Sequence, residues 1–184
     1  MALKTQQSSA GFRDLKVAQV TSDPVGGPVV LGTRYDVPLV QDGEMTYTYT
    51  IVEIKGDDKT ARVARKIDKV EGSFKVGAEN FDVVGMLQGA VVGAVTGSAP
   101  NQTQTMVITS DSKPAYFELW MQVMDAEEGG GDLQRRLHKC CITNQKESFS
   151  QDGAREIEFS FLAIPRDADN YIESRTKNET AVAI

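Results

Sequence analysis

REIEFSFLAI, residues 155–164, decides the fold class of this chain. Apolar and polar residues alternate along it. The apolar set is Ile157, Phe159, Phe161 and Ala163, and the polar set is Glu156, Glu158 and Ser160. Because successive side chains of a strand point to opposite faces, this period of two predicts a β-strand with one buried face. Pro165 ends the strand, and Asp152-Gly153 just before it predicts a hairpin turn from residues 146–151.

The same alternation recurs upstream of this strand. In PAYFELWMQVMD (114–125), Phe117, Leu119, Met121 and Val123 share one face, and Tyr116, Glu118, Trp120 and Gln122 share the other. MTYTYTIVEI (45–54) and ARVARKIDKV (61–70) are rich in residues that favour strands, and KGDDK joins them, which predicts a long hairpin. Shorter strands are predicted at 34–40, 73–76, 105–110 and 136–143, with Gly72 as a break.

One segment has a helical period. In residues 79–92, Phe81, Val84, Leu87 or Gln88, and Val91 recur at three- and four-residue spacing. Either Asn80 or the Gly77–Ala78 turn is a candidate cap, and Asp82 suits the first turn. The expected fold class is therefore mainly β, an antiparallel β-sandwich or barrel with one flanking α-helix at about 79–92.

The ends of the chain are polar. We expect a single domain over residues 1–184, with a flexible N-terminal arm at about 1–12 and an exposed C-terminal tail at about 166–184. Residues 21–44 are dense in Gly and Pro, which predicts loops with short strands between them.

The composition argues against some classes of function and indicates where the chain is made. The net charge of −6 and a pI of about 4.9 argue against a surface that grips nucleic acid. No apolar run follows a basic start, so we expect no secretory signal, and two adjacent cysteines give no disulfide framework. The chain is expected to be made in a reducing cytoplasm.

RRLHKCCITN (135–144) holds the only histidine, His138, and both cysteines, Cys140 and Cys141. A zinc site needs a second ligand pair, which the sequence lacks, and neighbouring strand residues point apart. His138 and Cys140 would share a face as a Cys–His pair, but no orienting acid is evident. We therefore expect an ordinary strand, with Cys140 and Ile142 on one face and Leu137, Lys139 and Cys141 on the other.

Three further patterns favour structural interpretations. Gly85, Gly89, Gly93 and Gly97 resemble membrane-helix packing motifs, but the uncharged run is too short to span a bilayer. DAEEGGGDL (125–133) does not match a calcium loop and is expected to be a flexible acidic connection. Phosphate-binding, nucleophile-elbow and zincin motifs are missing, so we expect no enzyme, no metal and no cofactor.

The order of these elements resembles the major tail tube protein of long-tailed bacteriophages. A strand, an acidic turn, a return strand and one helix ending at glycine come first, and further strands follow. The residues matching the later motifs are Pro114, Phe117, Leu119, Ala163, Ile164, Pro165 and Asp167. The resemblance covers roughly residues 45–167, and the paired cysteines depart from the family pattern.

The resemblance implies a structural virion protein that self-assembles into hexameric rings, which stack into a hollow tube for DNA delivery. Subunits would be assembled in the host bacterial cytoplasm and reside in the virion. Implied partners are other copies, the tape-measure, tail-tip and tail-terminator proteins, and phage DNA passing without specific binding; no membrane is involved. Like charge on the channel wall would prevent sticking of DNA, and neighbouring subunits would pair exposed sheet edges.

Candidate residues follow from this interpretation. Channel-facing acids are expected among Asp125, Glu127, Glu128, Asp132, Glu156 and Glu158. Inter-subunit contacts are expected at Phe12, Tyr116 and Trp120. Alternatives are another virion component, such as a capsid decoration or tail-completion protein, an enzyme or metal protein using His138 and Cys140, or a ligand-binding β-sandwich.

Overall fold

A computed structural model describes residues 9–56, 59–125, 131–149 and 155–184. The elements are β1 (Ser9–Ser22), β2 (Val30–Asp36), β3 (Val40–Gly56), β4 (Lys59–Val76), α1 (Phe81–Gln88), β5 (Val91–Val92), β6 (Met106–Val107), β7 (Phe117–Asp125), β8 (Asp132–Ser148), β9 (Glu156–Ala163) and β10 (Glu173–Asn178). The main sheet is antiparallel in the order β2-β1-β7-β8-β9-β4-β3, with β10 also paired to β8. The predicted class, mainly β with one helix, is confirmed.

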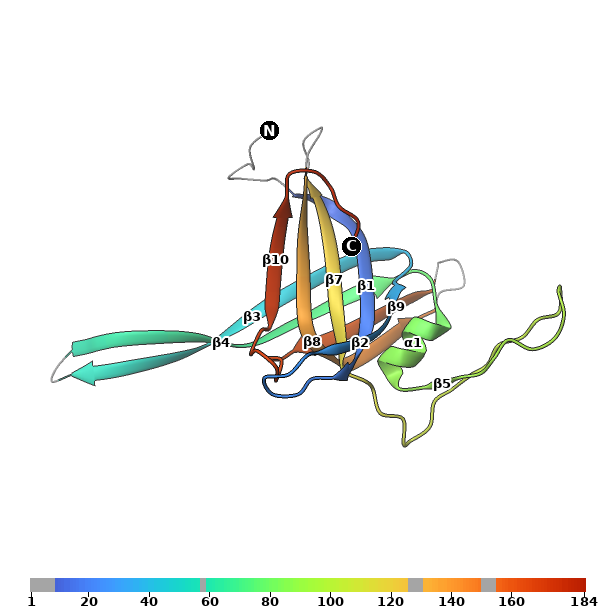
Figure 1. Cartoon of the computed structure of the whole chain (residues 1–184), viewed down its shortest axis with the longest axis horizontal. Helices are drawn as coiled ribbons and strands as arrows, with labels where there is room; N and C mark the ends of the chain where they lie inside the picture. Colours follow the sequence, from blue (N-terminus) through green and yellow to red (C-terminus); the bar gives the residue numbers. More distant parts are fainter. Residues whose placement is uncertain (1–8, 57–58, 126–130, 150–154) are drawn as a thin grey trace.

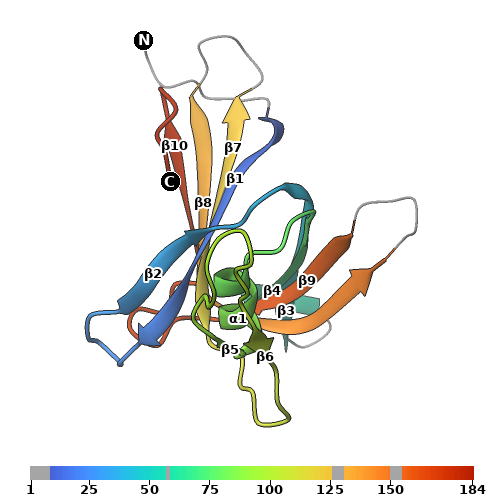
Figure 2. The same cartoon turned by 90° about the vertical axis from the view of Figure 1, so that its right-hand side faces the viewer.

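Strand β8 joins the two halves of the sheet. Its first half pairs with β7 and β10, and its second half pairs with β9. Figures 1 and 2 show β10, β8, β7 and β1 rising together, while β9, β4 and β3 cross below them. The inner faces of the two halves pack against each other, which makes a sandwich whose core includes Leu119, Leu137, Phe74 and Phe159.

The alternating strands behave as predicted. In β9, Ile157, Phe159, Phe161 and Ala163 are all buried, and the residues between them are not. The hairpin predicted at 45–70 is β3 and β4, although its turn residues 57–58 lie outside the described residues. The break predicted at Gly72 is wrong, because β4 continues through it. A Cβ there would lie 2.6 Å from the Phe161 ring, so glycine leaves room for that ring.

The helix is real but shorter than the predicted 79–92. Asn80 caps it by accepting a hydrogen bond from the Asp82 N–H at 3.0 Å. Gly89 ends it in the left-handed conformation at φ 67°, and a Cβ at this position would collide with the Lys113 backbone. The last predicted residues instead form β5. Val83, Val84 and Leu87 bury the inner face of α1 in the core.

Strand β8 contains an irregularity that the sequence analysis did not predict. Phe117 pairs with Cys140 and Leu119 pairs with Leu137, so one residue of β7, Glu118, lies opposite two of β8. This is a β-bulge at His138 and Lys139, and it reverses the alternation of the strand. Leu137 and Cys140 therefore both point into the core. The prediction that Leu137 shares a face with Lys139 is wrong, whereas Cys140 and Ile142 do share one.

The C-terminal segment is not the exposed tail predicted from residue 166. Residues 173–178 form β10, which pairs with residues 132–137 of β8. The His138 N–H donates to the Ile172 oxygen at 2.9 Å, which fixes the approach to β10. ESRTKN has no apolar alternation, because this strand lies at a polar edge of the sheet.

The N-terminal predictions are also adjusted. The N-terminal arm predicted at about 1–12 is too long, because residues 9–12 belong to β1, which begins at Ser9. Residues 1–8 lie outside the described residues. The strand predicted at 34–40 is shifted: β2 ends at Asp36, and Leu39 has a positive φ of 49° before β3 begins at Val40. A left-handed residue cannot continue a strand.

Candidate functional site

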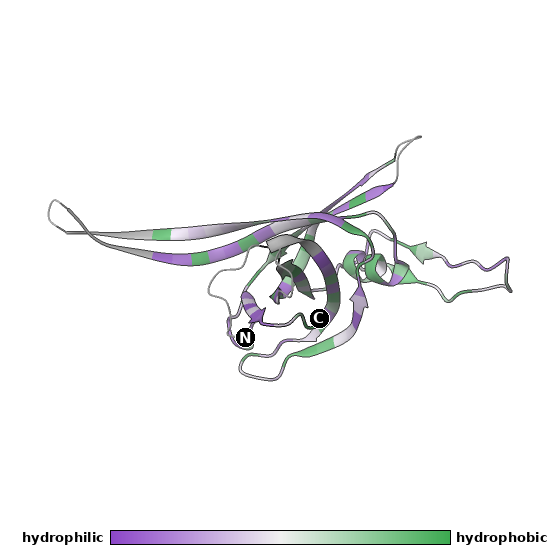
Figure 3. Cartoon of the chain, turned by 90° about the horizontal axis from the view of Figure 1, so that it is seen from above, coloured by the Kyte–Doolittle hydropathy of each residue, from purple (hydrophilic) through white to green (hydrophobic). Residues whose placement is uncertain are grey.

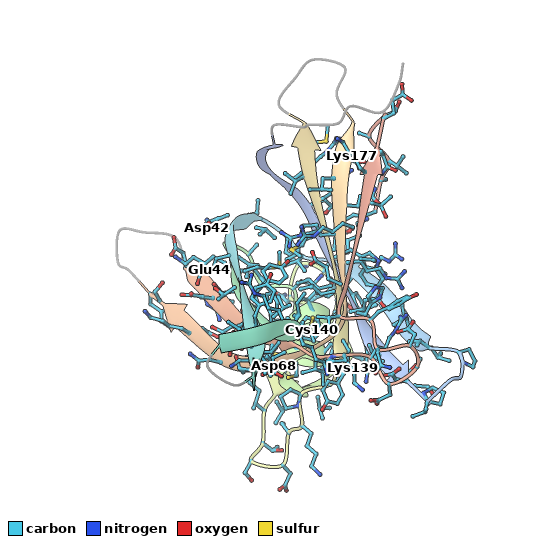
Figure 4. All side chains as sticks on the ribbon, turned by 90° about the vertical axis from the view of Figure 1, so that its left-hand side faces the viewer. Asp42, Glu44, Asp68, Lys139, Cys140 and Lys177 are labelled. Carbon is cyan, nitrogen blue, oxygen red and sulfur yellow. The ribbon has the colours of Figure 1, made fainter. Side chains whose placement is uncertain are left out.

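Cys140 does not have the surroundings of a reactive thiol. It is fully buried in the apolar core, and burial raises the pKa of its thiol well above the ordinary value. Figure 4 places the Cys140 label amid packed side chains and the Lys139 label near the loop that follows β9. Because the bulge separates His138 from Cys140, the two do not form a pair. Across residues 9–56, 59–125, 131–149 and 155–184, no group of His, Cys, Asp and Glu could hold a metal ion.

The outer face of β7 and β8 carries a buried polar cluster, formed by Glu118, Arg136, His138, Arg166 and Asp169. Glu118 is fully buried, pairs with Arg136, and lies 3.9 Å from the Arg166 guanidinium. Arg166 also pairs with Asp169. The cluster thus joins the C-terminal segment to the sheet by charge, since Arg166 and Asp169 follow β9.

His138 lies inside this cluster and is 3% exposed. Burial lowers its pKa, and the positive charges of Arg166 and Arg136 lower it further, to about 4. The Tyr171 ring lies 5.9 Å from the imidazole ring. At neutral pH, His138 is therefore an uncharged packing residue between two guanidinium groups.

The proton resonances of His138 are expected to titrate with a midpoint near pH 4 rather than 6.5. Between pH 4 and pH 6.5 the unfolded chain binds a proton at His138 that the folded chain does not bind. The contribution of His138 to the free energy of unfolding is therefore fully present above pH 6.5 and is lost as the pH falls toward 4. Its upper limit is about 3.4 kcal/mol. Proton NMR measures the midpoint without ambiguity, because the chain has one histidine. A midpoint near 6.5 would contradict the burial, and His138→Gln should remove this part of the pH dependence.

Lys139 anchors a second connection. Its ammonium donates to Asp23 at 2.8 Å and to Asp167 at 2.7 Å. Asp23 also accepts the backbone N–H groups of Asp167 and Ala168. Burial raises the pKa of Asp23, but the Lys139 and backbone hydrogen bonds outweigh it, so the pKa lies below the ordinary value. The loop between β1 and β2 is thereby fixed to the segment after β9.

The predicted channel-facing acids separate into three groups. Glu156 and Glu158 lie on the outer face of β9, as predicted from alternation. Asp132 is fully buried, so the prediction that it lines a channel is wrong. It accepts hydrogen bonds from the side chains of Gln122, Gln134 and Asn178, and from the Val182 N–H at 3.2 Å. Glu127, Glu128 and the Asp125 side chain lie outside the described residues.

Glu158 belongs to a larger acidic face. Asp42 and Glu44 on β3 and Glu158 on β9 surround a shallow hollow of about 220 Å³ with Lys75 and Ser73. Figure 4 labels Asp42 and Glu44 on the same strand, β3. The acidic face is thus the outer surface of β9, β4 and β3. Only its β9 part was predicted from the sequence, since Asp42 and Glu44 lie in a segment expected to be loops.

The residues predicted to contact other subunits differ in how far their side chains are exposed. Tyr116 is exposed, with the Lys139 ammonium 5.0 Å from its ring. Trp120 is only 7% exposed, because the guanidinium groups of Arg34 and Arg136 lie over its ring at 4.3 and 5.4 Å. The prediction that Trp120 offers an open contact surface is therefore wrong. The Phe12 side chain lies outside the described side chains.

The hairpin of β3 and β4 projects far from the body (Figure 1). Strand β9 pairs with β4 only from Val70 to Val76, so the rest of the hairpin is a two-stranded ribbon. This ribbon exposes Tyr49, Ile51 and Ile67, which we call the hairpin patch, and Tyr49 lies directly opposite Ile67. Tyr171 is also exposed and, with Ile67, lines a hollow of about 290 Å³ at the base of the ribbon.

A second extension, residues 91–108, leaves the opposite side of the body, as Figures 1 and 3 show. Val91 pairs with Val107, and Thr96 bridges Thr103, so this extension is a narrow loop. Its exposed apolar residues form the loop patch: Val91, Val95, Val107 and Ile108. Neither patch was predicted from the sequence. The long run of strand-favouring residues at 45–70 was the signal that β3 and β4 are longer than the neighbouring strands.

Within the described residues, no helix has both the length and the apolar character needed to cross a membrane. The helix that overlaps the glycine repeat, α1, ends at Gly89.

Comparisons with protein-family models and with curated proteins give no match. Solved structures similar to this chain include the SPP1 tail tube, with a TM-score of 0.42 and 13% identity over 92% of this chain and 78% of that chain. The tail of the empty GTA particle has a TM-score of 0.42 and 11% identity, over 88% and 95% of the two chains. The baseplate of the anti-feeding prophage has a TM-score of 0.43 and 9% identity, over 94% and 97%.

Proposed function

We propose that this chain is a structural subunit of a bacteriophage tail tube. Copies associate head to tail into rings, the rings stack into a hollow tube, and DNA passes through the channel. Six copies per ring, location in the virion, assembly in the host cytoplasm, and contact with tape-measure, tail-tip and tail-terminator proteins follow from the sequence resemblance. The channel needs no catalytic group, in keeping with the buried, unpaired state of Cys140 and His138.

The observation that carries the proposal is the pair of extensions on opposite sides of the body. Each is too thin to bury its own apolar side chains, and a two-stranded ribbon alone is marginally stable. Because the hairpin patch and the loop patch differ, contact between copies is heterologous, which generates rings or filaments rather than a closed dimer. In this proposal the hairpin patch of one copy packs against the loop patch of the next.

The acidic face suits the wall of a DNA channel. Asp42, Glu44 and Glu158 gather on the outer surface of one half of the sandwich. Repetition of this face around a ring gives a negative wall, which repels DNA phosphates and prevents sticking during transit. Glu156 and Glu158 are accordingly our candidates for residues that face the channel.

Electron microscopy of the concentrated, purified chain tests the proposal. Hollow rings or tubes are expected, and sedimentation should show a discrete oligomer that grows with protein concentration. A chain that stays monomeric even with tail-tip and tape-measure proteins added would overturn the proposal. Copurification with capsids instead of tails would favour a capsid decoration protein.

A further inference from the structure

A polar pocket of about 270 Å³ lies on the outer face of β7, β8 and β10. Arg34, Trp120, Arg136, Ser174 and Thr176 are among the residues that line it. None of the described lining residues carries a side-chain carboxylate, but Ile184, which also lines the pocket, carries the terminal carboxylate. Arg135 lines it as well, so the pocket is rich in hydrogen-bond donors, with three guanidinium groups and two hydroxyls beside the indole ring.

Arginine side chains are concentrated around this pocket. Arg34, Arg136 and Arg166 lie close enough that Arg34 and Arg166 both lower the pKa of Arg136, after the larger effect of its burial. Glu118 and Asp169 supply two negative charges against these three positive ones, and both carboxylates pair with Arg136 or Arg166. Among the described residues, Arg34 has no carboxylate partner and lies against Trp120 instead. Arg34 thus makes no ion pair with a described side chain, and the one acidic group of the lining is the terminal carboxylate of Ile184.

The arrangement also favours one kind of ligand by shape. Guanidinium groups present planar forks of N–H donors that match the oxygens of carboxylate and phosphate groups. The Trp120 ring holds both forks in place, at 4.3 Å from Arg34 and 5.4 Å from Arg136. Preorganised donors lose less conformational entropy on binding than free arginine side chains would.

We propose that this pocket binds a small oxyanion, a phosphate or carboxylate group, between Arg34 and Arg136. The inference is independent of ring assembly, because it rests on a pocket within one copy. Two sources share this chemistry: a free anion, or an acidic side chain of a second copy. The experiment separates them.

Trp120 is the only tryptophan, so its fluorescence reports on the pocket directly. Titration with inorganic phosphate at constant ionic strength should give a saturable change, and calorimetry should give the same affinity without relying on emission. Arg34→Gln is expected to weaken phosphate binding about tenfold, as the loss of one charge-assisted contact predicts. Arg65→Gln, at an exposed arginine on the hairpin, is the matched control and should bind as the unaltered chain does.

Arg34 is exposed, so its replacement should not disturb folding. Thr176→Val keeps every arginine and should weaken phosphate by a smaller factor. If a second copy supplies a carboxylate, the fluorescence change should appear with rising protein concentration alone, and phosphate should compete with it. A change that requires phosphate at every protein concentration assigns the site to the free anion. Absence of any saturable change, or equal binding by the Arg34 and Arg65 variants, would overturn the proposal.

Discussion

Replacing Tyr49 and Ile67 by aspartate is expected to abolish ring and tube formation while leaving the monomer folded. The two side chains lie opposite each other on the exposed ribbon of β3 and β4, where no described residue of the same copy covers them. Burial of an aromatic or branched side chain contributes about 1.5–3 kcal/mol. Loss of two such contacts should therefore lower the association constant by at least about 100-fold, and the added charges should lower it further.

The matched control for this variant lies on the same ribbon. Thr48→Asp with Thr50→Asp adds the same two negative charges to β3, at the positions that alternate with Tyr47, Tyr49 and Ile51. Sedimentation velocity and electron microscopy measure assembly, and circular dichroism measures folding. If the Tyr49 and Ile67 variant assembles as well as the control, the hairpin patch is not the contact, even if tubes form.

Replacing Glu118 by alanine is expected to cost about 3 kcal/mol of unfolding free energy. Glu118 is fully buried and is the carboxylate between Arg136 and Arg166, so its removal leaves two guanidinium groups facing each other. We take the lower end of the usual range, because the Arg136 side chain is 40% exposed and water screens part of its charge.

Urea unfolding at neutral pH measures this cost. Glu156→Ala, on the exposed edge of β9, is the control and should change stability by no more than about 0.5 kcal/mol. A cost below about 1 kcal/mol for Glu118→Ala would show that the buried polar cluster does not hold the C-terminal segment.

Alternation was the most reliable guide to this fold. It identified β7 and β9, and it assigned Ile157, Phe159 and Phe161 to the core, because a half-buried strand must alternate. Alternation did not predict the buried residues on strand faces that are covered by polar contacts. Glu118 and Gln122 are as buried as Leu119, yet they look like surface residues in sequence, because they have partners, Arg166 and Val182, that lie far away along the chain.

The bulge in β8 explains why the assignment of faces in RRLHKCCITN was only half right. Alternation puts His138 beside Cys140, but one extra residue in the strand moves His138 to the outer face. No local signal in HKCC marks this irregularity, since it depends on the pairing with β7. The candidate contact surfaces were missed for a related reason: the sequence shows which residues form β3, but not how far β3 extends beyond its neighbours.

Strand β10 has a consequence for the order of events in the cell. It pairs with the first half of β8, and together with Val182 it completes the surroundings of Asp132 and Glu173. During translation, residues 173–178 leave the ribosome after every other strand described here. A nascent chain therefore lacks one border of its sheet until synthesis reaches them, and domains generally fold as units. The sheet is therefore expected to be completed only after residues 173–178 have been synthesised.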